Sequence, residues 1–481
     1  MINMNKVKSN FLYNIVYQLL VLVIPLITAP YLSRVIGASG VGIYSYTYSI
    51  VYYFMLLVLL GVNNYGNRSI AKVRNNKDRL SKTFWSIYLF QLLMGIIMLF
   101  FYIMYVLLIN NNYTSIAWIE TLFIISAMID INWFYFGLEE FKITITRNMC
   151  IKVLSVILIF IFVRAKGDLW KYTLIMSSTT LISQLVLWSF VCKKVNFIKV
   201  SKHDILKHIK PNLILFIPVI AVSLYKIMDK IMLGSMSSIV EVGYYENAEK
   251  IINIPLTFIT SLGTVMLPRI SNILANGDIS KVNEYISKSV SFVMFLSFAM
   301  CFGLIAVGYN FAPIYFGKDF QKTGILIMLL SVTLPFLSFA NVLRTQYLIP
   351  NEEDKVYIIS VSLGALINLI MNFIFIPMYY SIGACIGTIA AEFTVMFYQV
   401  ISVRKKLNIK KYIKNISTFF IKSFIMFVIV YSFNYIHMND LIRIFVQVLI
   451  GITIYLLLNY KYINSIIDFK KVFIKFRKKF N

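Results

Sequence analysis

Six ionisable side chains interrupt two otherwise apolar stretches near the middle of the sequence. They carry three positive and three negative charges and are Lys226, Asp229, Lys230, Glu246, Glu249 and Lys250. Residues four apart share one face of a helix, so the first and third of these lie together, as do the fourth and sixth. One interpretation is a self-satisfied network, since the charges sum to zero. The other is a cavity in which the lysines bind an anionic substrate and the three carboxylates form a charge network or gate.

Arg34 is a further binding candidate because it has no acidic residue near it in the sequence. A guanidinium can hold a phosphate through two parallel hydrogen bonds, which an ammonium cannot. We therefore expect Arg34 to bind phosphate together with the three lysines. The alternative is an arginine that only extends its head group to the membrane surface. Asn14 and Gln18, one helical turn apart, supply either a polar side of the same cavity or a hydrogen bond between helices.

Two more carboxylates, Asp130 and Glu392, stand alone in apolar stretches. Each is a candidate member of the cavity charge network or gate, as a proton or sodium site or as a hydrogen-bonded contact between helices. We favour the contact for Glu392. The four cysteines and three histidines are scattered singly, without the spacing of metal ligands. We therefore expect no metal and no cofactor.

The elements that carry these residues are predicted to be membrane-spanning helices. Apolar residues make up 59% of the 481 and charged residues 14%, and the apolar ones form long runs. About 20 apolar residues in a helix cross the ~30 Å hydrocarbon layer, where only a helix satisfies the backbone groups of such a run. We predict an all-α, polytopic protein that is not an enzyme, because its loops are too short for a catalytic domain. The 14 expected spans are 11–32, 41–64, 83–109, 115–137, 148–165, 170–192, 211–233, 243–266, 288–310, 323–345, 356–377, 383–403, 416–437 and 441–459.

The basic residues predict how these helices are oriented. The net charge is +26, and most of the 46 lysines and arginines fall in alternate loops and the two termini. Cytoplasmic loops of membrane proteins carry this excess, so both termini are expected in the cytoplasm, in the cell membrane. The same placement explains the charge without nucleic acid, which we exclude as a partner.

An internal repeat is also expected. Residues 41–44 match 242–245 at a shift of 201, and residues 139–142 match 352–355 at a shift of 213. Matches after even numbers of helices are typical of parallel repeats related by an axis along the membrane normal. We therefore predict an N-terminal six-helix lobe (1–210), a second six-helix lobe (211–414) and two appended helices with a basic tail (415–481). Paired lobes suggest a central cavity and alternating access.

Several longer motifs resemble one family, the Wzx-type polysaccharide flippases of the multidrug/oligosaccharidyl-lipid/polysaccharide exporter superfamily. They cover the chain from about residue 5 to 405 and are Pro25–Gly37, Gly61–Lys72 with its Tyr65-Gly66-Asn67-Arg68 core, Asp130–Lys142, Asp229–Gly234, Leu267–Arg269, Arg344–Pro350 and Gly387–Glu392. The resemblance implies a V-shaped pair of lobes. It also implies movement of an undecaprenyl-diphosphate-linked oligosaccharide from the cytoplasmic to the outer leaflet, for capsule or O-antigen-type polysaccharides.

The resemblance further implies work beside a polysaccharide polymerase, and we expect a monomer in the lipid bilayer. Many relatives stop at 12 helices, so the last two are either a groove for a lipid tail, as in related lipid II flippases, or an addition without that role. The alternative function is a cation-coupled multidrug antiporter of the same superfamily. In that case Asp130 or Glu392 would be essential.

Overall fold

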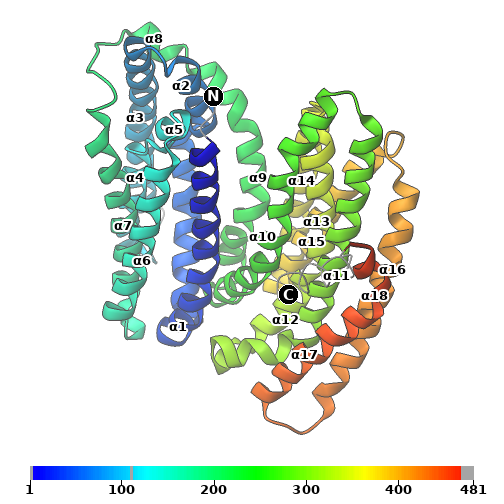
Figure 1. The fold of residues 1–481 in the computed structure, drawn as a ribbon. Coiled ribbons are helices and arrows are strands. Elements are labelled where there is room, and N and C mark those ends of the chain that lie inside the picture. The colour runs from blue at the N-terminus through cyan, green and yellow to red at the C-terminus, as the bar shows by residue number, and fades with distance from the viewer. Residues whose placement is uncertain (1–3, 109–111, 467–481) are drawn as a thin grey trace, which may run out of the picture. The chain divides into compact units, whose positions relative to one another are not determined.

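The computed structural model describes residues 4–108 and 112–466, and this part of the chain contains helices and no strand. Figure 1 shows the helices in order along the chain. They are α1 (Met4–Leu59), α2 (Val62–Val73), α3 (Lys77–Leu108), α4 (Thr114–Met128), α5 (Asn132–Gly137), α6 (Phe141–Phe162), α7 (Leu169–Val191), α8 (Lys202–Leu206), α9 (Ile209–Met236), α10 (Ile239–Ala275), α11 (Ile279–Phe316), α12 (Gln321–Ser331), α13 (Thr333–Leu343), α14 (Asp354–Tyr379), α15 (Ser381–Val403), α16 (Ile409–Ser432), α17 (Asp440–Leu458) and α18 (Tyr460–Ile466).

The expected membrane-spanning helices are present. Twelve segments of the described chain are long and apolar enough to cross a bilayer, and the first of them, 23–73, covers the second predicted span and the end of the first. These two meet at Gly37, whose φ of 71° and ψ of 179° interrupt the helical backbone of α1. The predicted seventh span is α9, with 28 residues and a length of about 42 Å at 1.5 Å per residue. Among the described residues α9 is not one of the twelve segments, so the number of spans agrees roughly with the predicted 14.

Helix ends differ from the prediction where polar residues extend an apolar helix beyond the bilayer. The helix α6 begins at Phe141 instead of 148, so Arg147, which we had expected in a cytoplasmic loop, lies within the helix and is buried. The short helices α2, α8 and α18 are also absent from the prediction. Their polar composition hides them from a search for apolar runs.

Contacts divide the chain into two units, of which the first comprises Met1–Asn247 and Asn372–Ala384. Its largest aromatic core lies where α3, α5 and α7 meet, and Phe84, Trp133 and Phe134 are fully buried there. Gly66 of α2 lies directly against the Trp133 ring, because a methyl group there would come within 2.6 Å of it. At one end of this unit the short α2 and α8 lie beside the start of α3 (Figure 1).

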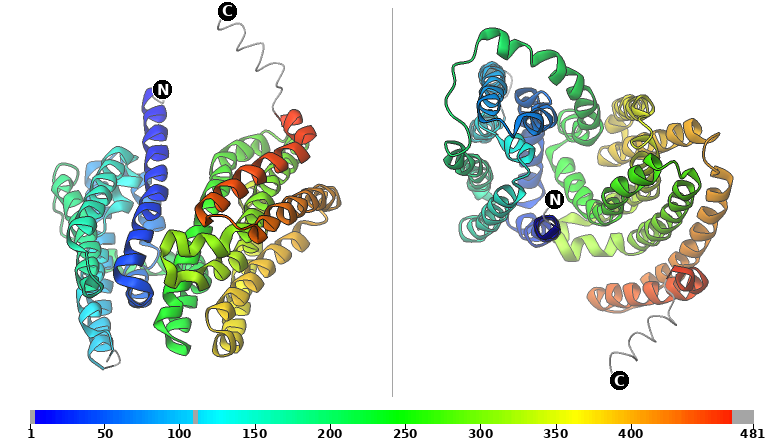
Figure 2. Two further views of the ribbon diagram at one scale, coloured as in Figure 1. Left: turned by 90° about the horizontal axis from the view of Figure 1, so that it is seen from below. Right: turned by 45° about the horizontal axis from the view of Figure 1, so that its top comes forward.

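The second unit comprises Ala248–Met371 and Cys385–Asn481. Its central helix is α11, which packs against α12, α13, α16 and α17 (Figure 2). The two C-terminal spans are firmly attached to it. The Tyr455 hydroxyl of α17 donates to the Phe295 carbonyl at 2.7 Å, and Asn415 Nδ2 of α16 donates to Ser291 Oγ at 3.1 Å. The predicted domain boundaries at 210 and 414 stay a prediction.

Matching positions of the predicted repeat have matching structures. Glu139 and Glu352, 213 residues apart, are both non-glycine residues with positive φ, at 59° and 56°. The following residue in each half is a glutamate that forms an ion pair with a lysine. Glu140 pairs with Lys194, and Glu353 pairs with Lys406. Positive φ is uncommon outside glycine, so its recurrence at equivalent positions supports a shared ancestry of the two halves.

Candidate functional site

An ion pair joins two helices at the centre of the predicted charge cluster. Lys230 Nζ of α9 lies 2.7 Å from Glu246 Oε2 of α10, and the two side chains are 15% and 18% exposed. Ser45 Oγ of α1 donates to the same carboxylate oxygen at 2.9 Å. Three helices of the first unit thus meet at one carboxylate, and part of the predicted network is paired as the self-satisfied interpretation requires.

Close backbone contact between α1 and α10 makes this meeting possible. A methyl group at Gly42 would lie 1.9 Å from the Ile239 carbonyl oxygen, and one at Gly243 would lie 2.1 Å from the Ala38 carbonyl oxygen. The contact is reciprocal, since 38 and 239 differ by 201, as do 42 and 243. Two copies of one motif related by a twofold axis make contacts of this kind. Only glycine allows so close an approach.

Asp229 is buried in a hydrogen-bonded group beside this pair. Its Oδ2 accepts from the Tyr245 hydroxyl at 2.8 Å, and its Oδ1 accepts from Asn372 Nδ2 at 2.6 Å. Asn372 is far away in the sequence and fully buried, and it was not among the predicted site residues. A buried carboxylate that receives two hydrogen bonds can remain in the membrane interior at an acceptable cost.

Arg34 and Lys226 are the two candidate cations of this unit with exposed side chains. Arg34 follows Ser33, a buried residue whose Oγ accepts from Asn247 Nδ2 at 2.8 Å, so the turn that carries Arg34 is anchored to α10. Lys226 lies about 25 Å along α9 from its start at Ile209, within the span. The structure therefore presents exposed positive charge on α1 and on α9.

Three other predicted site residues belong to the second unit. Glu249 and Lys250 are half-buried on α10, and Glu392 on α15 is buried. The side chains of Asn14 and Gln18 lie outside the described part of the chain. The roles assigned to these five residues stay predictions.

Asp130 occupies a break between α4 and α5, where helix carbonyls lose their usual partners. Its Oδ1 accepts from the backbone and side-chain nitrogens of Asn132, at 2.8 and 2.6 Å. Gln91 Nε2 donates to the Asp130 carbonyl at 2.8 Å, and the Trp188 indole donates to the Ile129 carbonyl at 2.9 Å. Buried Arg147 joins the group through the Asn132 amide oxygen at 2.8 Å. These bonds favour a structural contact over a proton or sodium site at Asp130.

Glu120, a carboxylate on α4 outside the predicted site, is completely buried in the first unit. Its Oε1 accepts from Thr47 Oγ1 at 2.9 Å, and its Oε2 has no hydrogen-bond partner among the described residues. Tyr48 and Phe123 stack edge-on beside it on the same two helices. The sequence did offer a signal for Glu120, because it is a single carboxylate inside an apolar run, as Asp130 is.

These features define a multi-pass helical membrane protein that holds ionisable groups inside the bilayer, as membrane transporters do. Residues 7–274, more than half of the chain, match the polysaccharide biosynthesis protein family, and the chain belongs to that family. A putative O-antigen transporter of Escherichia coli K12 is 26% identical over 84% of this chain and 98% of its own length.

Two solved structures have the same fold. A lipid II flippase MurJ in an inward closed conformation matches with a TM-score of 0.75 and 18% identity, over 95% of this chain and all of that one. An inward-facing multidrug resistance MATE transporter matches with a TM-score of 0.60 and 11% identity, over 81% and 98%. At these identities the structural likeness shows the fold alone.

Proposed function

We propose that this protein is a flippase for undecaprenyl-diphosphate-linked oligosaccharides, which it moves from the cytoplasmic to the outer leaflet by alternating access. The family of the chain concerns polysaccharide biosynthesis, and the similar E. coli protein is named as an O-antigen transporter. The charge of the candidate site agrees with a diphosphate, because the cationic side chains of Arg34 and Lys226 are exposed.

The observation that carries the proposal is exposed Lys226 within the span of α9. A lysine facing hydrocarbon near the middle of a bilayer costs roughly 2.5–3.5 kcal/mol, so an exposed one at this depth belongs to an aqueous surface. Arg34 is exposed on α1 as well, and a guanidinium is suited to a diphosphate. An aqueous, cation-bearing surface inside the membrane is what the passage of an anionic head group requires.

A cation-coupled multidrug antiporter is the second candidate, and buried Glu120 is the observation in its favour. A carboxylate with one unpartnered oxygen inside a helical bundle is suited to bind a proton or a metal cation. A MATE transporter shares the fold, so the fold is compatible with this candidate.

The remaining parts of the proposal concern setting and partners. The basic loops favour the cell membrane, with both termini in the cytoplasm. We assign the protein to two six-helix lobes with two appended helices, acting as a monomer. A polysaccharide polymerase that receives the transported units is the proposed functional partner.

Export of glycan by cells tests the proposal. A strain that lacks its own O-antigen flippase but makes a matching lipid-linked repeat unit would express the wild-type chain, Arg34→Ala, Lys226→Ala or the double variant. Each lost charge-assisted hydrogen bond contributes about 1.5–3 kcal/mol, so each single variant should lower export by about tenfold or more. Lys202→Ala, an exposed cation on α8, is the matched control and should export normally.

Membrane abundance of every variant is measured alongside, so that loss of protein is not mistaken for loss of transport. Export at the wild-type level by the double variant would remove both residues from the pathway. Purified protein in liposomes with a labelled lipid-linked oligosaccharide, with and without a membrane potential, then tests translocation directly. Efflux of cationic dyes that depends on Glu120, without glycan movement, would favour the antiporter.

A further inference from the structure

A cationic pocket lies at one end of the first unit, among α2, α3 and α9. Its volume is about 480 Å³, and its lining includes Arg68 and Lys72 of α2, Thr83 of α3 and Ile214 of α9. No residue that lines it is acidic. Arg68 and Lys72 are four residues apart, so both side chains leave the same face of α2 toward this space.

Some cations on the same end of the unit are already paired with carboxylates. Arg74 pairs with Glu139 at 2.7 Å, and Lys82 pairs with Asp204 at 3.0 Å. Within the described residues, neither Arg68 nor Lys72 takes part in an ion pair or side-chain hydrogen bond, and both are exposed. The pocket thus carries two positive charges that the protein itself does not neutralise.

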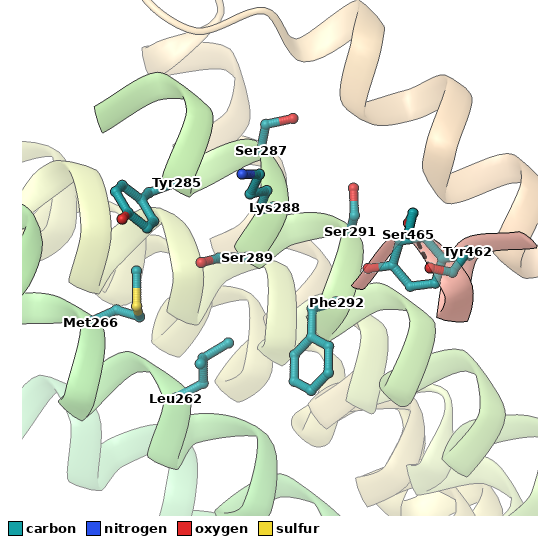
Figure 3. A pocket seen from close by; sticks show the side chains of 10 residues that line it. All are labelled: Leu262, Met266, Tyr285, Ser287, Lys288, Ser289, Ser291, Phe292, Tyr462 and Ser465. Carbon is teal, nitrogen blue, oxygen red and sulfur yellow. Dashed lines mark hydrogen bonds between the residues drawn. The ribbon is translucent and has the colours of Figure 1, made fainter. Parts of the chain in front are cut away.

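The second half of the repeat provides an internal comparison. At a shift of 201 the counterpart of Arg68 is Arg269, which stacks on the Tyr285 ring at 4.5 Å and donates to its hydroxyl. Tyr285 and Lys288 line a pocket of about 450 Å³ in the second unit (Figure 3). There Lys288 pairs with Glu284 at 2.5 Å. The equivalent arginine is therefore held by its own chain in one half and available to a ligand in the other.

One wall of the pocket in the first unit is a fixed polar surface. His208, which is buried, has its Nδ1 2.8 Å from the Tyr65 hydroxyl and its Nε2 2.8 Å from the Ser86 hydroxyl. Burial, and then the neighbouring Lys207, lower the pKa of His208 to about 4. The imidazole is therefore neutral at physiological pH and adds no third positive charge to Arg68 and Lys72.

Another part of the lining is apolar, and neighbouring apolar side chains of α9 are exposed. Pro211, Ile214 and Leu215 line the pocket, and the Ile214 side chain is 58% exposed. Leu213 and Ile217 on the same two turns are also exposed, as expected for a helix surface in contact with acyl chains. The cations therefore sit where a membrane span emerges from hydrocarbon.

We propose that this pocket binds the phosphate of a membrane lipid, with Arg68 and Lys72 on the phosphate and the lipid chain along Ile214 and Leu215. A soluble phosphate would leave the apolar wall without a partner, and a zwitterionic lipid would leave the cationic pair without a counter-charge. Two lipids share this chemistry, an anionic phospholipid and a polyprenyl diphosphate. The site is separate from Arg34 and Lys226, and the proposal does not depend on the flippase function.

Photo-crosslinking with defined lipids tests this assignment. The full-length protein is placed in phosphatidylcholine nanodiscs that contain a photoactivatable phosphatidylglycerol, a photoactivatable prenyl diphosphate or a photoactivatable phosphatidylcholine. Peptide mapping measures the yield on residues 209–220. One or both anionic probes should label this segment about tenfold more than phosphatidylcholine, because each charge-assisted contact is worth about a factor of ten. The anionic probe with the higher yield identifies the source of the phosphate.

Variants decide whether the two cations cause the labelling. Arg68→Gln with Lys72→Gln should reduce the anionic yield to the phosphatidylcholine level, while Arg68→Lys with Lys72→Arg should retain most of it. Arg74→Gln with Lys82→Gln is the control, because these cations lie on the same end but are already paired. Equal labelling by all three lipids would overturn the proposal. Undiminished labelling of a folded Arg68→Gln/Lys72→Gln variant, judged by its thermal transition, would overturn it too.

Discussion

At the residue scale, the ionisable side chains of the candidate site in the first unit differ in burial. Lys230 and Glu246 are paired and mostly buried, and Asp229 is hydrogen-bonded on both oxygens. Arg34 and Lys226 are exposed. The pairing of Lys230 with Glu246 agrees with the self-satisfied network, and the binding role of Arg34 and Lys226 stays a proposal. The paired residues fix the helices that present the exposed ones.

The ion pair leads to a prediction on stability. Glu246→Gln leaves the Lys230 ammonium with an uncharged partner inside the membrane, and breaking a buried pair in this way costs about 3–5 kcal/mol. The apparent melting temperature of the purified protein in detergent should therefore fall clearly. Replacing both residues, Lys230→Met with Glu246→Leu, should restore most of it, because no unpaired charge remains. A single variant as stable as the wild type would show that the pair is well hydrated.

The types of the site residues were predictable from the sequence, but their partners were not. A charge in an apolar run is visible at once, so Asp229, Lys230 and Glu246 could be named. Asn372 could not, because an amide in a membrane helix has no distinctive spacing and reaches Asp229 only through the tertiary fold. Arg147 was misplaced because a helix boundary was set seven residues too late.

At the element scale, small residues and breaks decide how the helices meet. Gly37 interrupts the helical backbone of α1, so this long helix contains two spans. The break at Asp130 divides one predicted span into α4 and α5, with its free carbonyls satisfied by Gln91 and Trp188. Apolar runs predicted the spans well because hydrocarbon demands helices, but breaks depend on distant partners that a run does not reveal.

The contact between α1 and α10 gives a prediction at this scale. Gly42→Ala places a methyl group 1.9 Å from a backbone oxygen, which cannot move without shifting a helix. We expect α1 and α10 to separate, so that Ser45 no longer reaches Glu246, with a loss of thermal stability and of glycan export.

Gly303→Ala in α11 is the matched control, because nothing lies within 4 Å of its added methyl group. There the change should be neutral or slightly stabilising, as alanine favours a helix by about 0.5–1 kcal/mol over glycine. Equal stability of the two variants would contradict the close approach.

At the scale of the whole molecule, the pattern of basic loops and the repeat agree with one another. The repeat places Glu139 and Glu352 in the same rare backbone conformation, each followed by a glutamate that pairs with a lysine after the sixth helix of its half. Parallel repeats with an even number of spans have equivalent loops on the same side of the membrane. Both sets of these loops are basic, so the excess of lysine and arginine in cytoplasmic loops predicts the same orientation for the two halves.

Orientation therefore yields a prediction for the whole chain that single cysteines can test. In a variant whose four native cysteines are replaced, Gly167→Cys and Lys318→Cys lie in exposed loops predicted outside, and Asn76→Cys and Asn276→Cys lie in exposed loops predicted inside. A membrane-impermeant maleimide should label the first two in intact cells and the second two only after permeabilisation. Asn76 follows α2, so its labelling also decides which leaflet supplies the lipid for the pocket at Arg68 and Lys72. Labelling of Asn76→Cys in intact cells would invert the topology and place that pocket, with its two cations, in the outer leaflet.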